Sequence, residues 1–282
     1  MVLVERAYAK INLTLDVLRK RPDGYHEVDM VMQTVDLSDL IWMDVKESGI
    51  HLDSGASNIP LDDRNLAYVA AQKFLQTAQI TSGVTITLEK NIPVAAGLAG
   101  GSSDAAAVLR GLNRLFDTGY SVDKLAEMGA SIGSDVPFCV YGGSAVAKGR
   151  GEQLTRFRHN LKAWAIIVRP PIFVSTADVY GALTRDNMSE QPRSQQMVDA
   201  LLRCDFEQVV GLVTNGLRPA AERLYPEVKE YADRLSSTIG QPVHMSGSGP
   251  TLFILTPTMR RAQRTYNAIR GFMKEVYLCR LI

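Results

Sequence analysis

Alternation of apolar and polar residues marks the first element of the chain. Between residues 7 and 18, apolar side chains occupy every second position from Ala9 to Val17, and polar side chains occupy most of the positions between them. Because successive side chains of a strand point to opposite faces, this pattern predicts a half-buried strand. It also places Lys10 and Asn12 on the same face of that strand.

Strand-like and helix-like segments follow in mixed blocks. Extended segments are expected from Tyr25, at 40–45, 50–52, 84–88, 144–148, 163–168 and 276–281, and on both sides of a glycine turn between 243 and 255. Helices are expected at 66–77, 103–116, 121–132, 194–203, 206–214, 226–238 and 259–272, and a helix cap at Ser175. Because strands and helices do not alternate regularly, the pattern predicts an α+β fold.

Local signals refine three of these boundaries. Asp62, Asp63 and Asn65 are the candidate caps of the helix at 66–77. Pro137 disfavours a helical Val136, so residues 134–138 are expected to form a turn. The pattern weakens and turns polar around 150–160, which predicts two domains, residues 1–155 and residues 156–282.

Composition places the chain among ordinary globular proteins. It has 282 residues, of which 46% are hydrophobic and 22% charged, and its net charge is +1. This charge disfavours nucleic acid as a partner. No apolar run approaches the ~20 residues of a membrane span, and the first residues resemble a strand rather than a signal peptide. Three widely spaced cysteines predict reduced thiols in a cytoplasmic protein, and the scattered histidines disfavour a zinc site.

A glycine-rich loop carries the first chemical signal. Residues 93–104 read Pro-Val-Ala-Ala-Gly-Leu-Ala-Gly-Gly-Ser-Ser-Asp and separate an expected strand from an expected helix. Small residues before a helix N-terminus let backbone N–H groups approach an anion, which predicts a phosphate site. A tight turn without a ligand is the alternative. The loop lacks the lysine of the P-loop, and the chain lacks the strand order of a Rossmann fold and the signatures of protein kinases.

Two further segments turn this signal into a family resemblance. Lys10-Ile-Asn12 precedes the loop, and Ser246-Gly-Ser-Gly-Pro-Thr251 follows it. The order and spacing of the three segments resemble those of the GHMP kinases over the whole chain. The resemblance implies a two-domain GHMP fold, with an N-terminal domain like domain 2 of ribosomal protein S5 and a ferredoxin-like α+β C-terminal domain. It also implies an active site in the cleft between the domains.

One branch of this family matches more closely. The matching segments are Ala9–Leu13, Arg21–Glu27, Gly97–Asp104 and Gly133–Phe138. This branch implies transfer of the γ-phosphoryl group of ATP, with Mg²⁺, to the 2-hydroxyl of a cytidine-diphosphate-linked methylerythritol, in the non-mevalonate route to isoprenoid precursors. The alternatives are another GHMP small-molecule kinase and a relative that binds nucleotide without catalysis.

The resemblance also assigns roles to single residues. Lys10 is the candidate cation at the transferred group and Asp135 the candidate acid beside it; without the resemblance they read as a solvated lysine and a turn or cap aspartate. Asn12 is expected to orient the substrate. The cytidine side is assigned to the residues Tyr25, His26, Thr176 and Tyr180.

Nucleotide binding is assigned to the loop and to two residues outside it. We expect Lys90 and Asn65 near the adenine. The loop residues are Val94, Ala95, Ala96, Gly97, Leu98, Ala99, Gly100, Gly101, Ser102, Ser103 and Asp104. Ala99 departs from the family, which has glycine there. If this position requires a positive φ, alanine costs roughly 1 kcal/mol or more, and we expect the chain to tolerate it. The magnesium ligands and the oligomeric state are left open.

Overall fold

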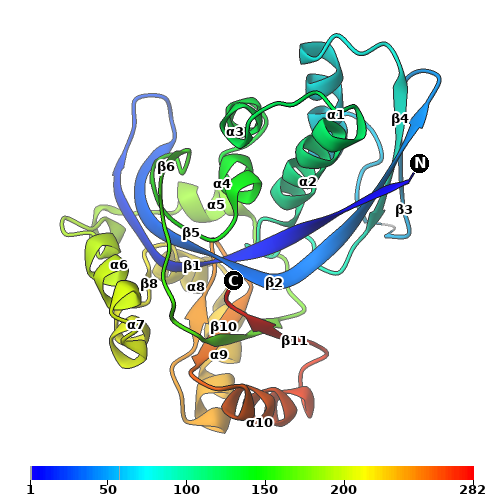
Figure 1. Ribbon diagram of the computed structural model, residues 1–282. Coiled ribbons are helices and arrows are strands. Elements are labelled where there is room, and N and C mark those ends of the chain that lie inside the picture. Colours follow the sequence, from blue (N-terminus) through cyan, green and yellow to red (C-terminus); the bar gives the residue numbers. More distant parts are fainter. Residues whose placement is uncertain (1, 57) are drawn as a thin grey trace. The chain divides into compact units, whose positions relative to one another are not determined.

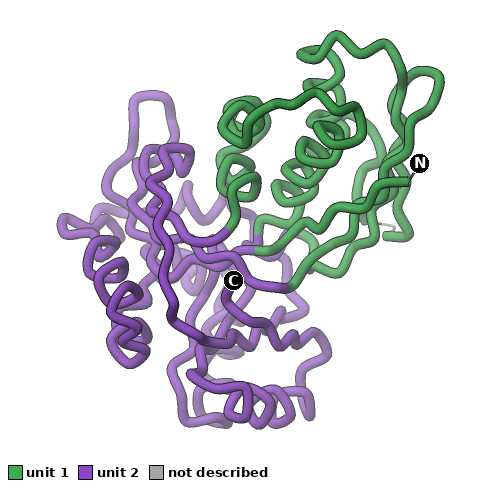
Figure 2. The backbone as a smooth tube through the Cα atoms, in the orientation of Figure 1, with its two compact units in different colours: residues 1–9, 37–94, 99–142 green, residues 10–36, 95–98, 143–282 purple. Residues whose placement is uncertain are grey.

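Two long strands run through the fold. The computed structural model describes residues 2–56 and 58–282. Strands β1 (Leu3–Lys20) and β2 (His26–Lys46) belong to a seven-stranded sheet of order β3-β4-β2-β1-β8, in which β5 also pairs with β2 and β6 with β5 (Figure 1). The chain divides into two compact units, one of residues 1–9, 37–94 and 99–142 and the other of residues 10–36, 95–98 and 143–282 (Figure 2). Both long strands contribute residues to both units.

The first unit packs helices on strands. β4 (Gly83–Glu89) runs antiparallel to β2 and parallel to β3 (Ile50–Ser54). The helices are α1 (Leu66–Thr77), α2 (Gly100–Leu115), α3 (Val122–Ala130) and α4 (Val136–Tyr141). α1 and α2 lie side by side (Figure 1). Their buried alanines, including Ala70 and Ala106, pack with Phe74, Ile86 and Leu88 in one hydrophobic core, because small side chains allow a close approach.

The second unit contains a sheet of its own. It consists of β7 (Trp164–Arg169), β9 (His244–Met245), β10 (Leu252–Thr256) and β11 (Glu275–Arg280), in the order β11-β7-β10-β9 and antiparallel throughout. This is the strand order of a ferredoxin-like fold. Helix α10 (Met259–Arg270) packs on β7, β10 and β11 and against α9 (Pro226–Ile239).

Shorter elements complete the second unit. They are β5 (Ser144–Gly149), β6 (Gln153–Phe157), α5 (Thr176–Gly181), η1 (Arg185–Asn187), α6 (Ser194–Leu202), α7 (Phe206–Leu212), β8 (Thr214–Asn215) and α8 (Arg218–Leu224). β8 pairs in parallel with β1, with Leu15 opposite Asn215.

Several sequence predictions need correction. The strand that begins the chain is not half-buried, because every residue from Ala9 to Val17 is buried. The expected turn at residues 134–138 is wrong after Asp135: Pro137 lies in the first turn of α4, where its missing N–H costs no hydrogen bond. β6, η1, β8 and α8 were not anticipated, and β2 is one continuous strand. The division into compact units also differs from the predicted boundary at 155, which stays a prediction.

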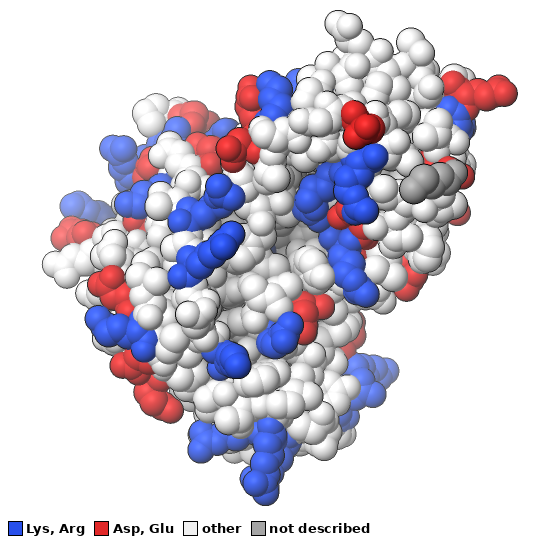
Figure 3. Space-filling model, viewed as in Figure 1, with Lys and Arg blue, Asp and Glu red and all other residues white. Residues whose placement is uncertain are grey.

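Charged side chains are mixed on the surface. On the face shown in Figure 3, Lys and Arg side chains lie in separate groups, several of them beside Asp or Glu. Among the described residues, Arg110 and Arg114 both pair with Glu5, and Arg21 pairs with Asp23 at 3.1 Å. This mixture agrees with a net charge of only +1.

Candidate active site

The glycine-rich loop ends in the first turn of α2. This helix begins at Gly100, three residues before the predicted start, so the N–H groups of Gly100, Gly101 and Ser102 belong to the helix N-terminus. Its N-cap residue, Ala99, is in the left-handed conformation with φ 59° and makes no side-chain cap hydrogen bond. Backbone donors at the positive end of a helix dipole are suited to bind an anion.

The loop also contacts the glycine hairpin of residues 246–251. Gly97 has a φ of +74°, and a Cβ atom on it would stand 2.4 Å from the carbonyl oxygen of Ser246. The Ser246 hydroxyl donates to the carbonyl oxygen of Gly97 at 3.1 Å. Only glycine fits at position 97, because any side chain would separate these two backbones. Gly101 differs, since a Cβ atom on it would have Leu66 Cδ1 as its nearest neighbour, at 3.9 Å.

Lys10 lies buried beside this contact. Its side chain donates from Nζ to Asn12 Oδ1 at 2.8 Å and to the carbonyl oxygen of Gly97 at 3.4 Å. Asn12 Oδ1 also accepts from the backbone N–H of Gly247 at 3.1 Å. Lys10 is 4% exposed, which excludes the solvated lysine that its position alone suggested. Residues from all three sequence motifs therefore meet around one ammonium group.

A second buried lysine lies between two carboxylates. Lys90 Nζ pairs with Asp39 and, at 2.5 Å, with Asp104 Oδ2. The other oxygen of Asp39 accepts from the N–H groups of Asn91 and Ile92, whereas Asp104 Oδ1 is buried and has no hydrogen-bond partner among the described residues. Burial raises the pKa of Asp104 to about 8; Lys90 opposes the rise and Asp39 adds to it.

Other residues assigned to the nucleotide have structural partners. Asn65 is the N-cap of α1: its Oδ1 accepts from Ala67 N at 2.9 Å, and its Nδ2 donates to the carbonyl oxygen of Pro60 at 2.8 Å. This confirms one of the three candidate caps. The Ser103 hydroxyl donates to the carbonyl oxygen of Tyr8 at 2.6 Å. Contacts of Asn65 and Ser103 with a nucleotide stay predictions.

Asp135 stands directly before α4. Its backbone is helical, with φ −85° and ψ −13°, and its half-buried side chain makes no cap hydrogen bond. Asp135 and Lys10 belong to different compact units. Their convergence on one reacting group stays a prediction.

The residues assigned to the cytidine side all lie in the second unit. The rings of His26 and Tyr180 are adjacent, with centroids 5.4 Å apart. Tyr25 is 56% exposed, and the guanidinium of Arg150 lies 5.0 Å above its ring. Thr176 and Ser248 share a hydrogen bond of 2.8 Å between their hydroxyls, which links α5 to the glycine hairpin.

The environment of His26 sets its charge. Burial and, to a lesser degree, the positive charge of Lys20 lower the pKa of His26. The ring is therefore neutral at physiological pH, with one nitrogen as a donor and the other as an acceptor.

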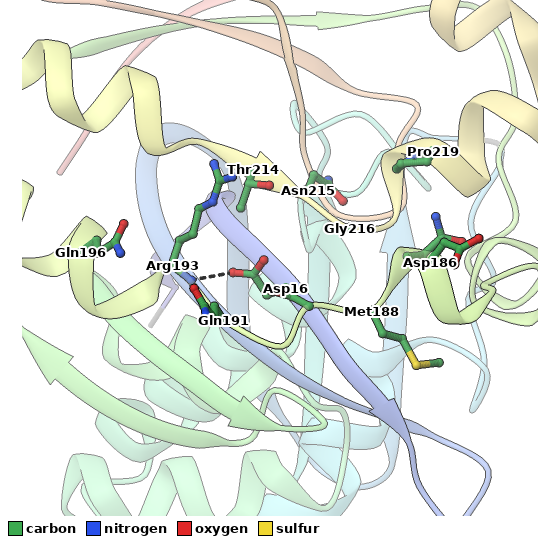
Figure 4. Close-up of a pocket in the computed structure, with 12 residues that line it drawn as sticks. Asp16, Asp186, Met188, Gln191, Arg193, Gln196, Thr214, Asn215, Gly216 and Pro219 are labelled. Atoms are coloured by element: carbon green, nitrogen blue, oxygen red, sulfur yellow. Dashed lines mark hydrogen bonds between the residues drawn. The ribbon is translucent and has the colours of Figure 1, made fainter.

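A separate cavity of about 460 Å³ opens in the second unit (Figure 4). Asp16 lies in it and accepts from the backbone N–H of Arg193 at 2.9 Å. Asn215 also lines the cavity, and none of the residues assigned from the sequence does.

Within the described part of the chain, no cluster of three or more His, Cys, Asp or Glu side chains is arranged for a metal, and no helix is long and apolar enough to cross a membrane.

Comparison with known proteins identifies the family. The model of the GHMP kinase N-terminal domain matches residues 65–143, and that of the GHMP kinase C-terminal domain matches residues 197–275. A protein of Brevibacillus brevis named 4-diphosphocytidyl-2-C-methyl-D-erythritol kinase is 50% identical over 98% of this chain and 95% of its own length. The chain belongs to the GHMP kinase family. It is an ATP-dependent kinase, as the resemblance implied.

Further relatives agree with this result. A protein of Exiguobacterium sibiricum with the same name is 49% identical over 100% of this chain and 99% of its own. The crystal structure of a 4-(cytidine 5'-diphospho)-2C-methyl-D-erythritol kinase matches with a TM-score of 0.84 and 34% identity, covering 99% of both chains. A homoserine kinase from Cytophaga hutchinsonii, 19% identical with a TM-score of 0.79, covers 99% of this chain and 95% of its own and shares the fold. The predicted GHMP fold class is confirmed.

Sequence reasoning missed two residues of this GHMP kinase. Asp39, which pairs with Lys90, lies within the long strand β2 directly after Ser38 and matches no motif. Asn215 donates to the carbonyl oxygens of Met245 and Gly247, yet it lies in a two-residue strand that no periodicity reveals. Because both residues follow another polar residue, the sequence carries no signal that marks them.

The left-handed Ala99 generates a stability prediction. Replacing it by glycine, in Ala99→Gly, removes the steric cost of a Cβ atom at φ 59°, so we expect a gain of roughly 1 kcal/mol and a rise in Tm of about 2 °C. Thermal unfolding followed by circular dichroism measures this change. The control is Ala78→Gly, at φ −83°, which should lower Tm. A lower Tm for Ala99→Gly would show that this backbone carries no strain.

Proposed function

We propose that this GHMP kinase transfers the γ-phosphoryl group of ATP to the 2-hydroxyl of 4-diphosphocytidyl-2-C-methyl-D-erythritol, giving the 2-phosphate and ADP in the non-mevalonate isoprenoid pathway. The main support for this proposal is the 50% sequence identity, over nearly the whole chain, to a relative named for this substrate. The segment Arg21–Glu27, which distinguishes this branch in sequence, runs from the turn after β1 into the start of β2, and Arg21 pairs with Glu27 at 2.9 Å.

The phosphates of ATP bind at the start of α2 in this proposal. The N–H groups of Gly100, Gly101 and Ser102 supply donors, and the open space at Gly101 lets a phosphate approach the backbone. The partly exposed hydroxyl of Ser102 and the phosphates are oxygen ligands that suit Mg²⁺, which needs few protein ligands because it keeps several waters. When bound, the ion neutralises charge on the phosphates.

Lys10 and Asp135 act on the transferred group. The bond from the γ-phosphorus to its bridging oxygen breaks, and a bond to the substrate hydroxyl oxygen forms. The Lys10 ammonium, held by Asn12 and Gly97, stabilises the negative charge on the transferred oxygens. Asp135 accepts the proton of the substrate hydroxyl. Asn12 is only 1% exposed and its Nδ2 donates to Met30 Sδ at 3.2 Å, so in this proposal it orients the Lys10 ammonium toward the substrate through its oxygen.

The cytidine ring is bound by aromatic side chains. Tyr25 is exposed and stacks on the base with the ring face that Arg150 does not cover, and Tyr180 supports His26 by ring contact. One ring nitrogen of the neutral His26 hydrogen-bonds the polar edge of cytosine in this proposal, and it discriminates against uracil because the donor and acceptor pattern at the 4-position is inverted there. Thr176, at the start of α5, completes this side of the site.

The proposed setting is the cytoplasm, where ATP is available. Among the described residues, Cys139, Cys204 and Cys279 form no disulfide, which supports a reducing compartment. The scattered surface charges support a small-molecule substrate rather than a nucleic acid partner.

Loss of Lys10 or Asp135 should abolish most turnover. Because each group stabilises the transition state, we expect Lys10→Ala and Asp135→Ala to lower the single-turnover rate on the order of 10²–10³-fold. The exposed Lys162 supplies the control variant Lys162→Ala. A folded variant that retains a near wild-type rate would remove that residue from the mechanism.

Phosphate binding by the glycine-rich loop can be tested at Gly101. A valine there adds branched carbons where a phosphate must approach, so Gly101→Val should raise the dissociation constant for ATP at least about tenfold, which corresponds to 1.4 kcal/mol. Calorimetry measures the affinity. Gly211→Val, at another open helical glycine, is the control. Unchanged ATP affinity in Gly101→Val would place the phosphates elsewhere.

Substrate choice tests the proposed function itself. We expect the cytidine compound to be phosphorylated faster than mevalonate, phosphomevalonate or homoserine, and methylerythritol phosphate without cytidine to be a poor substrate, because remote binding energy is lost. Tyr25→Ala should raise KM for the cytidine compound by the equivalent of roughly 1–3 kcal/mol, and Tyr25→Phe should raise it less. Steady-state ADP release measures both effects. Faster turnover of another acceptor contradicts the assignment.

A further inference from the structure

Asn215 holds the glycine hairpin through the amide nitrogen of its side chain. Its Nδ2 donates to the carbonyl oxygens of Met245 and Gly247, each at 2.8 Å, and its Oδ1 accepts from the N–H of Leu217 at 2.9 Å. Two hydrogen bonds from one amide group fix two alternate carbonyls of the turn. Asn215 itself lies on β8, opposite Leu15 of β1, and lines the cavity of Figure 4.

The hairpin links Asn215 to Lys10 through hydrogen bonds. Gly247 has a φ of +57°, and its N–H donates to Asn12 Oδ1 at 3.1 Å. The same oxygen accepts from Lys10 Nζ at 2.8 Å. A shift of the Gly247 backbone therefore moves the acceptor that holds the ammonium. Gly97 limits the opposite movement, because its carbonyl oxygen lies only 3.0 Å from the Cβ position of Gly247.

We propose that Asn215 is a positioning residue for Lys10, acting through the carbonyl of Gly247, the N–H of Gly247 and the side chain of Asn12. Asn215 touches no reacting atom in this scheme. The inference rests on the proposed function, in which Lys10 acts on the transferred phosphoryl group. Its chemical requirement is specific: position 215 needs a side chain that donates two hydrogen bonds and accepts one.

The isosteric variant Asn215→Asp tests this requirement. It keeps the shape and the acceptor for Leu217, but it places a carboxylate oxygen against two carbonyl oxygens. The matched control is Asn187→Asp, at the same cavity: Asn187 Oδ1 accepts from Thr184 N and Oγ1, and aspartate keeps both bonds.

We expect a selective loss of kcat. Because misplacement of a catalytic group by about 1 Å costs on the order of 10²-fold, Asn215→Asp should lower kcat by roughly 10- to 100-fold, while KM for ATP and for the cytidine compound changes less than about threefold. Asn187→Asp should retain the wild-type kcat. A wild-type kcat in Asn215→Asp overturns the proposal.

A double-mutant comparison separates positioning from general damage. In the Lys10→Ala background, Asn215→Asp should lower the residual rate little, because the group that it positions is already absent. Full additivity of the two losses overturns the proposal. If Asn215→Asp does not fold, Asn215→Ser, which keeps one donor, takes its place in the same comparison.

A substrate-independent measurement keeps this inference distinct from the proposed function. Nitrogen NMR of lysine-labelled protein reports the Lys10 ammonium, assigned by its loss in Lys10→Ala. Asn215→Asp should shift this resonance and Asn187→Asp should not; an unshifted resonance overturns the proposal. An inactive wild-type protein would contradict the proposed function alone.

Discussion

A buried ammonium group requires acceptors, and the arrangement around Lys10 follows from that requirement. Removing a charge from water costs several kcal/mol unless hydrogen bonds replace the lost hydration. The acceptors are an amide oxygen two residues away and a carbonyl oxygen of the glycine-rich loop, 87 residues further along the chain. The glycine hairpin supplies the N–H that fixes the amide oxygen. Three segments that are distant in sequence are thus held together around the Lys10 ammonium group.

Glycine makes this convergence possible because backbones must touch. The carbonyl of Ser246 stands where a side chain of residue 97 would be, and Gly247 and Gly97 meet with similarly little space. Since both glycines also have positive φ values, substitution at either position strains the backbone as well as the packing. Gly101 has neither constraint, so its openness reflects space beside the N-terminus of α2 rather than a packing requirement. Within one loop, Gly97 therefore allows close backbone packing, whereas Gly101 leaves open space at the helix N-terminus.

The sequence predicted most elements because their patterns are local. The limits of α1 match its pattern, and the Asn65 cap is a local signal. Features that depend on tertiary contacts were harder to predict. The burial of residues 9–17 of β1 requires a cover on both faces, and the early start of α2 overrides the low helix propensity of two glycines. The roles of Asp39 and Asn215 arise from partners 51 and 30 residues away, respectively. Family motifs located Lys10, Asn12 and the two glycine segments that contact them, whereas Asn215, which holds Gly247, came from the fold.

In the proposed reaction, the residues around Lys10 direct the γ-phosphoryl group of ATP to one hydroxyl of a cytidine-linked polyol. Phosphorus NMR of the product formed from ATP and 4-diphosphocytidyl-2-C-methyl-D-erythritol tests this selectivity, because it reports both the new ester and the carbon that bears it. We expect one new monophosphate resonance, from a phosphate ester at the 2-position, in equal amount to the ADP formed. Phosphate on another hydroxyl, or ADP with free inorganic phosphate and no ester, would contradict it.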